Sequence, residues 1–429
     1  MPAPERPRLR STITGQLDPE DPNFVWLYDS ARLTRQMMRV HRQLVPILAL
    51  FDGTNTTLDM QVHLLRLTDG QLVPSEVLHD LAAKLDEALF LEGPRLQERL
   101  AAFLRAPVRE PACIGAYEGE PEALRRQLAG LFSGPRGPGL PVLNGPPDGR
   151  LRGALIPHID LHRGGHTFAW GFKELAERSD ASVFVILGTA HYSARRFTLT
   201  RKDFRTPLGV AVTDKAYVDR IAAVYGPAAF EDEVAHLPEH SIEFQVVFLQ
   251  YLLGDRRPFT IVPILVGSFH DCIAGATPPH EQADIYLMIQ ALRRAEAESG
   301  AKVCYIASGD LAHLGPKFGD PAPVSRPQLD QSRTRDHELL RRAAAADREG
   351  LFHIILGEQD ERRICGFPPT YTLLSVLEPD HGRLLHYDQY VEPSGFESVS
   401  FASLAFYSRA EPRDGACAAA AAPDRHPHP

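Results

Sequence analysis

The chain has 429 residues, with 46 lysines and arginines against 55 aspartates and glutamates, which gives a formal net charge of −9. This balance argues against a nucleic-acid partner and against docking on acidic lipids. With 44% hydrophobic and 24% charged residues, the composition is that of an ordinary globular protein. The first residues show no apolar signal segment, and no run of about 18 apolar residues occurs, so we expect a cytoplasmic protein with no membrane partner.

The cysteines and histidines point to different chemistries. The five cysteines are widely spaced and include no Cys-x-x-Cys pair, which argues against a disulfide framework or a zinc ribbon. We therefore expect reduced thiols. Thirteen of the 18 histidines lie between residues 151 and 408, where most of the informative motifs also lie.

The first third of the chain predicts a small helical domain after an extension. Residues 1–28 are Pro-rich and aperiodic, and Asp29 is a plausible N-cap for the first helix. A short strand over Leu89–Leu91 ends at the turn of Gly93. Helices are expected over residues 29–48, 58–67 and 75–89. This order favours a helical accessory domain over residues 29–132, either winged-helix-like or a plain helical bundle.

A Gly/Pro-rich stretch over residues 133–148 cannot sustain a helix or a central strand, so it predicts a linker. Beyond it, strand-length apolar runs alternate with longer helical patterns, which predicts an α/β domain over residues 149–408. The Ala/Pro/His-rich segment 409–429 predicts a disordered tail. Strands are expected over 153–157, 182–187, 259–266 and 303–307, helices over 168–178 and 242–253, and a closing strand pair over 383–391 and 398–407.

Histidines follow four of these strands. They are His158, His191, His270 and His313, accompanied by Asp160 after the first strand and Asp310 after the fourth. Ligands of open α/β sheets bind beyond the carboxyl ends of the strands. A single histidine is more often a packed side chain than a ligand, but four at equivalent positions indicate a metal site. Imidazole with carboxylate in an open site favours non-haem iron or catalytic zinc.

A second cluster opens the helix expected over 242–253. Glu239 and Glu243 are four residues apart, so an acid on this helical face could orient His240 as a metal ligand or a base. The alternative is that both acids complement the positive end of the helix dipole.

Two further segments are candidate parts of the pocket. The two glycines between His162 and His166 predict a loop at the mouth of the site, with Arg163 placed to meet an anionic substrate. Cys365 lines the same pocket or is a buried structural cysteine.

These residues together resemble the Memo family, including the AmmeMemoRadiSam system protein B group, and through it the class III extradiol dioxygenase fold. The resemblance covers most of residues 150–408, and the helical N-terminal region looks like an extra domain of some bacterial members. It is carried, in this order, by Ile156-Pro157-His158, Leu187-Gly188-Thr189-Ala190-His191, Glu239-His240-Ser241-Ile242-Glu243, Ile261–Gly267, Ser308-Gly309-Asp310-Leu311-Ala312-His313 and Ile364-Cys365-Gly366.

The resemblance implies a metal held by His158, His191 and His240, with iron first and copper or zinc as alternatives. Ala312 stands where some members carry a cysteine ligand, which implies a His-rich site completed by Asp310, His313 or water. Two functions follow: a dioxygenase-like oxidoreductase of a small molecule, with Glu239 and His240 as acid/base machinery, or a metal-binding accessory protein with radical-SAM and AMMECR-type partner proteins.

Overall fold

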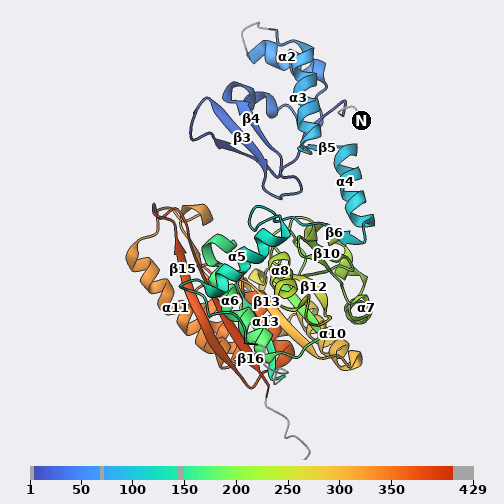
Figure 1. Ribbon diagram of the computed structural model, residues 1–429. Helices are drawn as coiled ribbons and strands as arrows, with labels where there is room; N and C mark the ends of the chain where they lie inside the picture. The colour runs from blue at the N-terminus through green and yellow to red at the C-terminus, as the bar shows by residue number, and fades with distance from the viewer. Residues whose placement is uncertain (1–3, 68–71, 143–148, 409–429) are drawn as a thin grey trace, which may run out of the picture.

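The structure is a computed structural model that describes residues 4–67, 72–142 and 149–408 (Figure 1). The second part of the expected linker, residues 143–148, and the expected tail over 409–429 lie outside the described residues.

An eight-stranded mixed sheet forms the centre of the larger part of the molecule, with strand order β14-β16-β7-β13-β8-β12-β9 and β15 paired to β16. Strands β7, β13, β8 and β12 run parallel, whereas β16 and β9 are antiparallel to their neighbours. The strands are β7 (Leu151–Ile156), β8 (Val183–Thr189), β9 (Phe197–Leu199), β12 (Thr260–Val266), β13 (Val303–Ser308), β14 (His313–Leu314), β15 (His381–Val391) and β16 (Ser398–Tyr407).

Helices cover both faces of this sheet because alternate residues of the buried strands point to opposite sides. On β8, Val183, Val185 and Leu187 belong to one hydrophobic core, while Phe184 and Ile186 belong to the other. The first core includes α7 (Lys215–Tyr225), α10 (Ala283–Ser299), α11 (Arg326–Ala344), α12 (Arg348–Gly357) and α13 (Phe367–Leu377). The second includes α5 (Pro121–Ser133), α6 (Leu161–Arg178) and α8 (Glu243–Leu253).

The α/β class is thus confirmed, and each strand and helix expected after residue 149 is present. Most ends shift by one or two residues, but the helix expected over 168–178 begins seven residues earlier, at Leu161. The structure adds a small sheet of β6 (Val108–Arg109), β10 (Asp203–Thr206) and β11 (Gly209–Ala211), and the short helix α9 (His270–Ala274). Among the described residues, none of the helices has the length and apolarity that crossing a bilayer requires.

The N-terminal region differs from the expectation, because it begins with strands. β2 (Ile13–Leu17), β3 (Phe24–Asp29) and β4 (Met37–His41) form an antiparallel sheet. The predictions of an aperiodic extension and of a helix over 29–48 are wrong here: Asp29 ends a strand whose buried and half-buried residues alternate, and its carboxylate pairs with buried Arg10. A plain helical bundle is also excluded. The other elements are β1 (Arg8–Leu9), α1 (Val45–Leu48), α2 (Thr57–Leu67), α3 (Ser75–Glu87), β5 (Leu91–Glu92) and α4 (Pro94–Arg105).

Residues 108–133 pack with the α/β domain. β6 pairs in parallel with β10, and the apolar face of α5, with Leu124, Leu128 and Phe132 fully buried, belongs to the same core as α6 and α8. Residues 136–142 also contact α6, since the Pro138 carbonyl accepts a hydrogen bond from Lys173. These contacts favour a domain boundary near residue 107, ahead of the one expected at the linker.

Two substitutions that each create a cavity, one on either side of residue 107, test this boundary. Leu128→Ala and Leu85→Ala each remove a fully buried side chain, from the α/β core and the N-terminal core respectively, at a cost of about 2 to 5 kcal/mol. In calorimetric melts, we expect Leu128→Ala to lower the transition of the α/β domain and Leu85→Ala to lower a separate one. If both substitutions lower the same transition and leave the other unchanged, the boundary near residue 107 is wrong.

Candidate metal centre

The candidate site lies where three parallel strands end. His158 follows β7, His191 follows β8 and Asp310 follows β13, while His240 lies in the segment before α8. All four line one pocket of about 360 Å³, as expected for the carboxyl edge of an α/β sheet. The positions of the strand ends therefore predict the location of the site.

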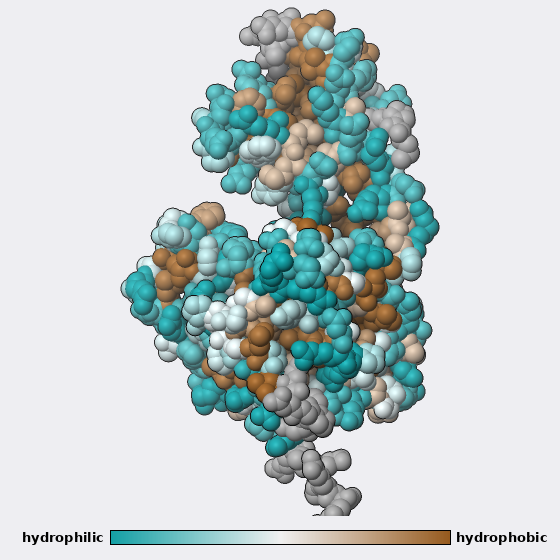
Figure 2. Space-filling view, viewed as in Figure 1, coloured by the Kyte–Doolittle hydropathy of each residue, from teal (hydrophilic) through white to brown (hydrophobic). Residues whose placement is uncertain are grey.

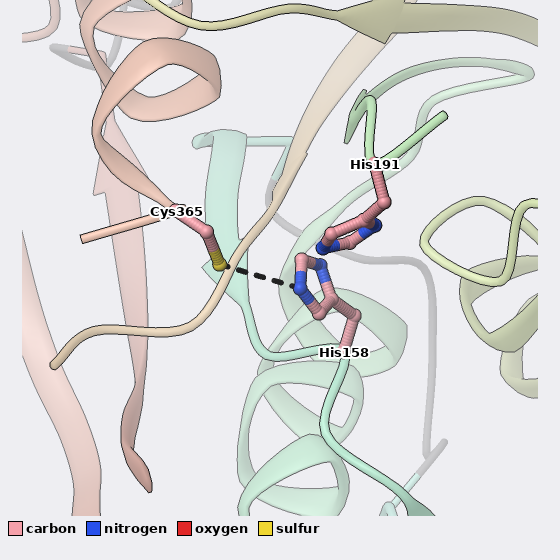
Figure 3. A group of neighbouring side chains, drawn as sticks. All are labelled: His158, His191 and Cys365. Atoms are coloured by element: carbon pink, nitrogen blue, oxygen red, sulfur yellow. Dashed lines mark hydrogen bonds between the residues drawn. The ribbon is translucent and has the colours of Figure 1, made fainter. Parts of the chain in front are cut away.

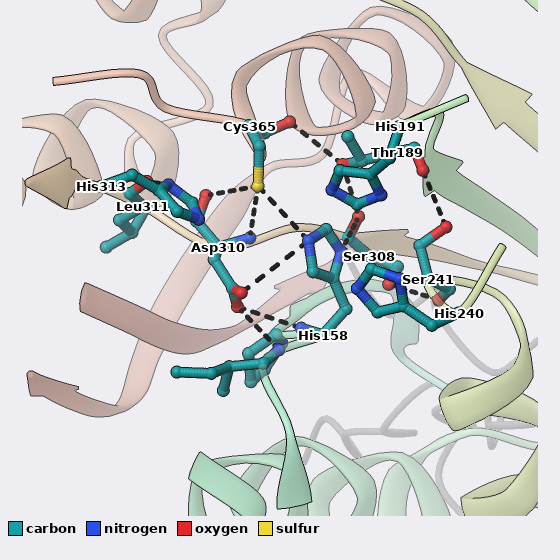
Figure 4. Close-up of polar contacts among 12 residues, drawn as sticks. His158, Thr189, His191, His240, Ser241, Ser308, Asp310, Leu311, His313 and Cys365 are labelled. Carbon is teal, nitrogen blue, oxygen red and sulfur yellow. Dashed lines mark hydrogen bonds and ion pairs between the residues drawn. The ribbon is translucent and has the colours of Figure 1, made fainter. Parts of the chain in front are cut away.

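The three histidines implied by the resemblance are in mutual contact (Figure 4). The ring centroid of His158 lies 5.0 Å from that of His191 and 5.0 Å from that of His240. The His191 and His240 rings are stacked, with centroids 4.7 Å apart. Burial lowers the pKa of His158 well below its ordinary value, and the two neighbouring imidazoles lower it further. His158 is consequently a neutral imidazole, the form that binds metals.

The Nδ1 atom of each ring already has a neighbour in the chain. His158 Nδ1 lies 3.2 Å from the Ser308 carbonyl oxygen, and His191 Nδ1 lies 3.0 Å from Glu239 Oε1. His240 Nδ1 is 3.2 Å from the same carboxylate oxygen, although without the alignment of a hydrogen bond. An acceptor at one ring nitrogen fixes the tautomer and the orientation of a metal-binding histidine, so Nε2 is the atom left to ligate.

The buried carboxylate of Glu239 positions His191 and His240. Its side chain is 1% exposed, and its carboxylate accepts hydrogen bonds from the backbone N–H groups of His191, His240 and Ser241 at 2.8 to 3.0 Å. Burial would raise its pKa, but the neighbouring His191 and His240 hold the pKa well below the usual range. The same charge pairing outweighs burial at His191 and raises the pKa of that imidazole. Glu239 thus touches both histidines as an ionised carboxylate.

Cys365 also belongs to the cluster, although the sequence alone does not decide whether it lines the pocket or is a buried structural cysteine. Its Sγ lies 3.4 Å from His158 Nε2 and accepts a hydrogen bond from the Asp310 backbone N–H at 3.3 Å (Figure 3). Ligand atoms of His158, His191 and Cys365 lie within 4.8 Å of one another, as do those of His191, Glu239 and His240. The structure thus places Cys365 in the pocket, beside the His-rich set for which Asp310, His313 or water was expected as the completing ligand.

Two glycines bring the Cys365 loop to the end of β13. A Cβ added to Gly309 would lie only 2.2 Å from the Cα of Gly366, so the two backbones touch where any larger residue would separate them. The Gly366 N–H donates to the Asp310 carbonyl at 2.8 Å. This contact places the thiol beside His158.

Some of the remaining predicted pocket residues line the pocket and others do not. Asp310 accepts hydrogen bonds from the backbone N–H groups of His158 and Ile159 at 3.0 and 3.3 Å, and burial raises its pKa to about 7. Asp160 and His313 also line the pocket. Burial lowers the pKa of His313 to about 4, and its Nδ1 lies 3.0 Å from two backbone carbonyls.

His162, His166 and His270 lie outside this pocket. The loop expected between His162 and His166 is wrong: both are in α6, which accommodates its glycines because Gly164 and Gly165 pack tightly against neighbouring side chains. His162 is exposed, and His166 is buried 2.9 Å from Asp388. His270 is exposed at the start of α9 and lines a second pocket that shares His191, Arg363 and Cys365 with the first.

Arg109 is a supporting residue that the sequence pattern did not reveal. It is fully buried, pairs with Glu243, and donates to the His236 and Glu239 carbonyls at 2.9 and 2.5 Å. Glu243 therefore faces Arg109, and of the two acids it is Glu239 that contacts His240. A lone arginine in a short strand carried no signal that could have identified this role.

The comparisons with known proteins fit this geometry. A family model described as Memo-like protein matches residues 109–405. The chain belongs to the Memo-like family. A MEMO1 family protein of Aquifex aeolicus is 29% identical to it over 374 residues, 85% of this chain and 91% of that protein. A MEMO1 family protein of Methanopyrus kandleri is 31% identical over 307 residues, 70% of this chain and 98% of that protein.

The relatives cover different shares of this Memo-like chain. The alignment with the Aquifex aeolicus protein is longer than the 109–405 span, so it includes residues of the N-terminal region. A MEMO1 family protein of Sulfolobus acidocaldarius matches 63% of this chain, at 29% identity over 279 residues. The residues of the candidate metal centre all lie within the family span.

Buried His236, three residues before Glu239, makes the stability of the protein depend on pH. His236 is buried, its Nε2–H donates to the Thr198 carbonyl at 3.1 Å, and burial lowers its pKa to about 3. Below pH ~6.5 the His236 side chain gains a proton in the unfolded chain but not in the folded chain, so the free energy of unfolding decreases as the pH is lowered. From pH 7 to pH 5 the loss is about 2 kcal/mol.

His236→Gln keeps a donor for Thr198 and removes the titration. Urea titrations at pH 7 and pH 5 are expected to show a smaller loss of stability in the variant than in the wild type. Equal losses in the two proteins would show that His236 is protonated in the folded state as readily as in the unfolded one.

Proposed function

We propose that this Memo-like protein is a metal-dependent oxidoreductase of the dioxygenase-like kind, acting on a small organic molecule. The observation that carries the proposal is the convergence of His158, His191 and Cys365 ligand atoms within 4.8 Å at a pocket beyond the strand ends. His191 also belongs to the second group, with Glu239 and His240.

The residues present fit a transition metal. The Nδ1 atoms of His158 and His191 lie against acceptors in the chain, and Nδ1 of His240 lies 3.2 Å from Glu239 Oε1. The Nε2 atoms of the three imidazoles are therefore the available ligand atoms, and Cys365 adds a soft sulfur donor. Imidazole and thiolate together suit iron, copper and zinc. An oxidoreductase uses a redox-active metal, which disfavours zinc, and we keep iron as the first expectation with copper as the redox-active alternative. When bound, such a metal would supply Lewis acidity and electron transfer.

The chain's own residues supply orientation and proton transfer. Glu239 is a positioning residue, since its oxygens contact the backbone and rings of His191 and His240 rather than the pocket. His240 lines the pocket, and its Nε2 can serve either as a third metal ligand or as the atom that transfers a proton to or from a bound substrate, but not as both at once.

The metal assignment predicts a loss of binding. The wild-type chain is expected to bind about one transition metal, and the combined His158→Ala, His191→Ala and His240→Ala substitutions to abolish binding, because three of the clustered donors are removed. Cys365→Ser should weaken binding without altering the fold. Metal content is measured by elemental analysis after anaerobic loading.

His270→Gln is the matched control, because His270 also follows a strand but is exposed outside the cluster. It should bind metal like the wild type. Stoichiometric metal in the folded triple variant would sink the assignment.

The role of His240 is separable from metal binding. If His240 transfers a proton, His240→Gln is expected to retain metal, while oxygen consumption with a catechol-type substrate falls by about 10²- to 10⁴-fold and its pH profile changes. If His240 is mainly a ligand, the variant loses metal. Unchanged metal content, rate and pH profile would contradict both roles.

A second candidate function is a metal-binding accessory protein of a radical-SAM system, and a surface feature favours it. The exposed apolar residues Leu58, Val62 and Leu65 are spaced along one face of α2. Figure 2 shows hydrophobic residues gathered over α2 and α3 of the N-terminal unit. Such a face is typical of a protein contact. Metal binding without oxygen consumption under any tested substrate would favour this function over the oxidoreductase.

A further inference from the structure

The pocket in front of the metal cluster is lined by three cationic side chains from different parts of the fold. Arg163 comes from α6, Lys317 from the 3₁₀ turn Pro316–Phe318, and Arg363 from the segment after α12. They lie in the same pocket as His158, His191, His240 and Cys365. Each of the three is also paired with a carboxylate, so the pocket presents cationic donors rather than a net positive charge.

Carboxylates fix these cations, and two of those carboxylates lie outside the pocket lining. Glu397 pairs with Lys317 and lies 3.1 Å from Arg163, and Asp320 lies 2.8 Å from Arg363. The cationic side chains of these pairs line the pocket, whereas Glu397 and Asp320 do not. Asp160 does line the pocket, 2.6 Å from Arg163, and Asp310 is bound to backbone N–H groups.

Arg163 has a donor left over. Its Nη1 and Nη2 reach Glu397 and Asp160, its guanidinium lies over the Tyr390 ring at 5.2 Å, and its Nε is buried without an acceptor among the described residues. A buried donor without a partner is unfavourable, so a ligand acceptor that reaches it would be stabilised there. Guanidinium groups match carboxylates through paired N–H donors.

The same pocket offers apolar contacts. Ile159, Phe318 and Val399 line it together with the cations, and about 360 Å³ is at the lower end of the range for small-molecule sites. A ligand with an anionic group and a compact apolar body would contact both kinds of surface.

We propose that the pocket selects a small organic carboxylate with an aromatic or other apolar body, bound through its carboxylate by Arg163, Lys317 and Arg363. As the substrate class of the oxidoreductase, this inference rests on the proposed function. The binding itself depends on the cations and can be measured without metal.

The test compares benzoate with benzamide, its neutral analogue of the same shape, by titration calorimetry on the full chain. Benzoate is expected to bind at least ten-fold more tightly, because charge-assisted hydrogen bonds are about twice as strong as neutral ones. Lys317→Gln and Arg363→Gln are each expected to weaken benzoate binding by roughly ten-fold and to leave benzamide binding unchanged. Both side chains are partly exposed, at 44% and 40%, so their replacement should not disturb folding.

Lys215→Gln is the matched control, a partly exposed cation paired with Asp203 at the start of α7, outside the pocket. It should bind benzoate like the wild type. Equal binding of benzoate and benzamide, no benzoate binding in the millimolar range, or full benzoate affinity in both Lys317→Gln and Arg363→Gln would overturn the proposal.

Repeating the titration on metal-depleted protein separates the two proposals. Charge-dependent benzoate binding in a chain that takes up no metal would support the carboxylate site and remove the proposed oxidoreductase function. Stoichiometric metal with no preference for benzoate would leave the oxidoreductase function standing and overturn the carboxylate site.

Discussion

The candidate site depends on one buried carboxylate. Glu239 accepts hydrogen bonds from backbone N–H groups on both sides of the pocket, those of His191 after β8 and of His240 and Ser241 before α8. It also contacts the Nδ1 atoms of both imidazoles. A buried charge of this kind is tolerated only where it is paired and fully hydrogen-bonded. Removing it would release two loops and two histidines together.

Much of this site follows from rules that act locally along the chain. Buried parallel strands appear as continuous apolar runs, and ligands gather after them, so the amino-acid pattern alone is enough to place His158, His191 and Asp310. The fold class followed from the same alternation. The family relationship then added His240, whose position before a helix was ambiguous by itself.

Other parts depend on contacts between distant residues, which a single sequence does not show. Cys365 is brought to His158 across 207 positions by a backbone contact between two glycines, and nothing near it in the sequence marks a ligand. The glycines of α6 looked like loop residues, but tight packing explains them. The first strands were missed because the apolar residues around Met37–His41 fit helical spacing as well as alternation, and only pairing with β3 decides between them.

The contact of Gly309 with Gly366 has a consequence for how the cluster responds to a metal ion. Because the two backbones touch, and Asp310 N–H and Cys365 Sγ are hydrogen-bonded across the contact, the sulfur and the β13 loop form one rigid body. The main chain therefore sets how close the Cα atoms of Cys365 and His158 come, and the hydrogen bond from Asp310 N–H helps to hold the Sγ in place. The entropy of assembling the donors is lost when the protein folds, so little remains to be lost on metal uptake. If the proposed metal centre exists, a cavity fixed in this way would discriminate among ions by their preferred coordination geometry, because the protein could not rearrange to suit each one.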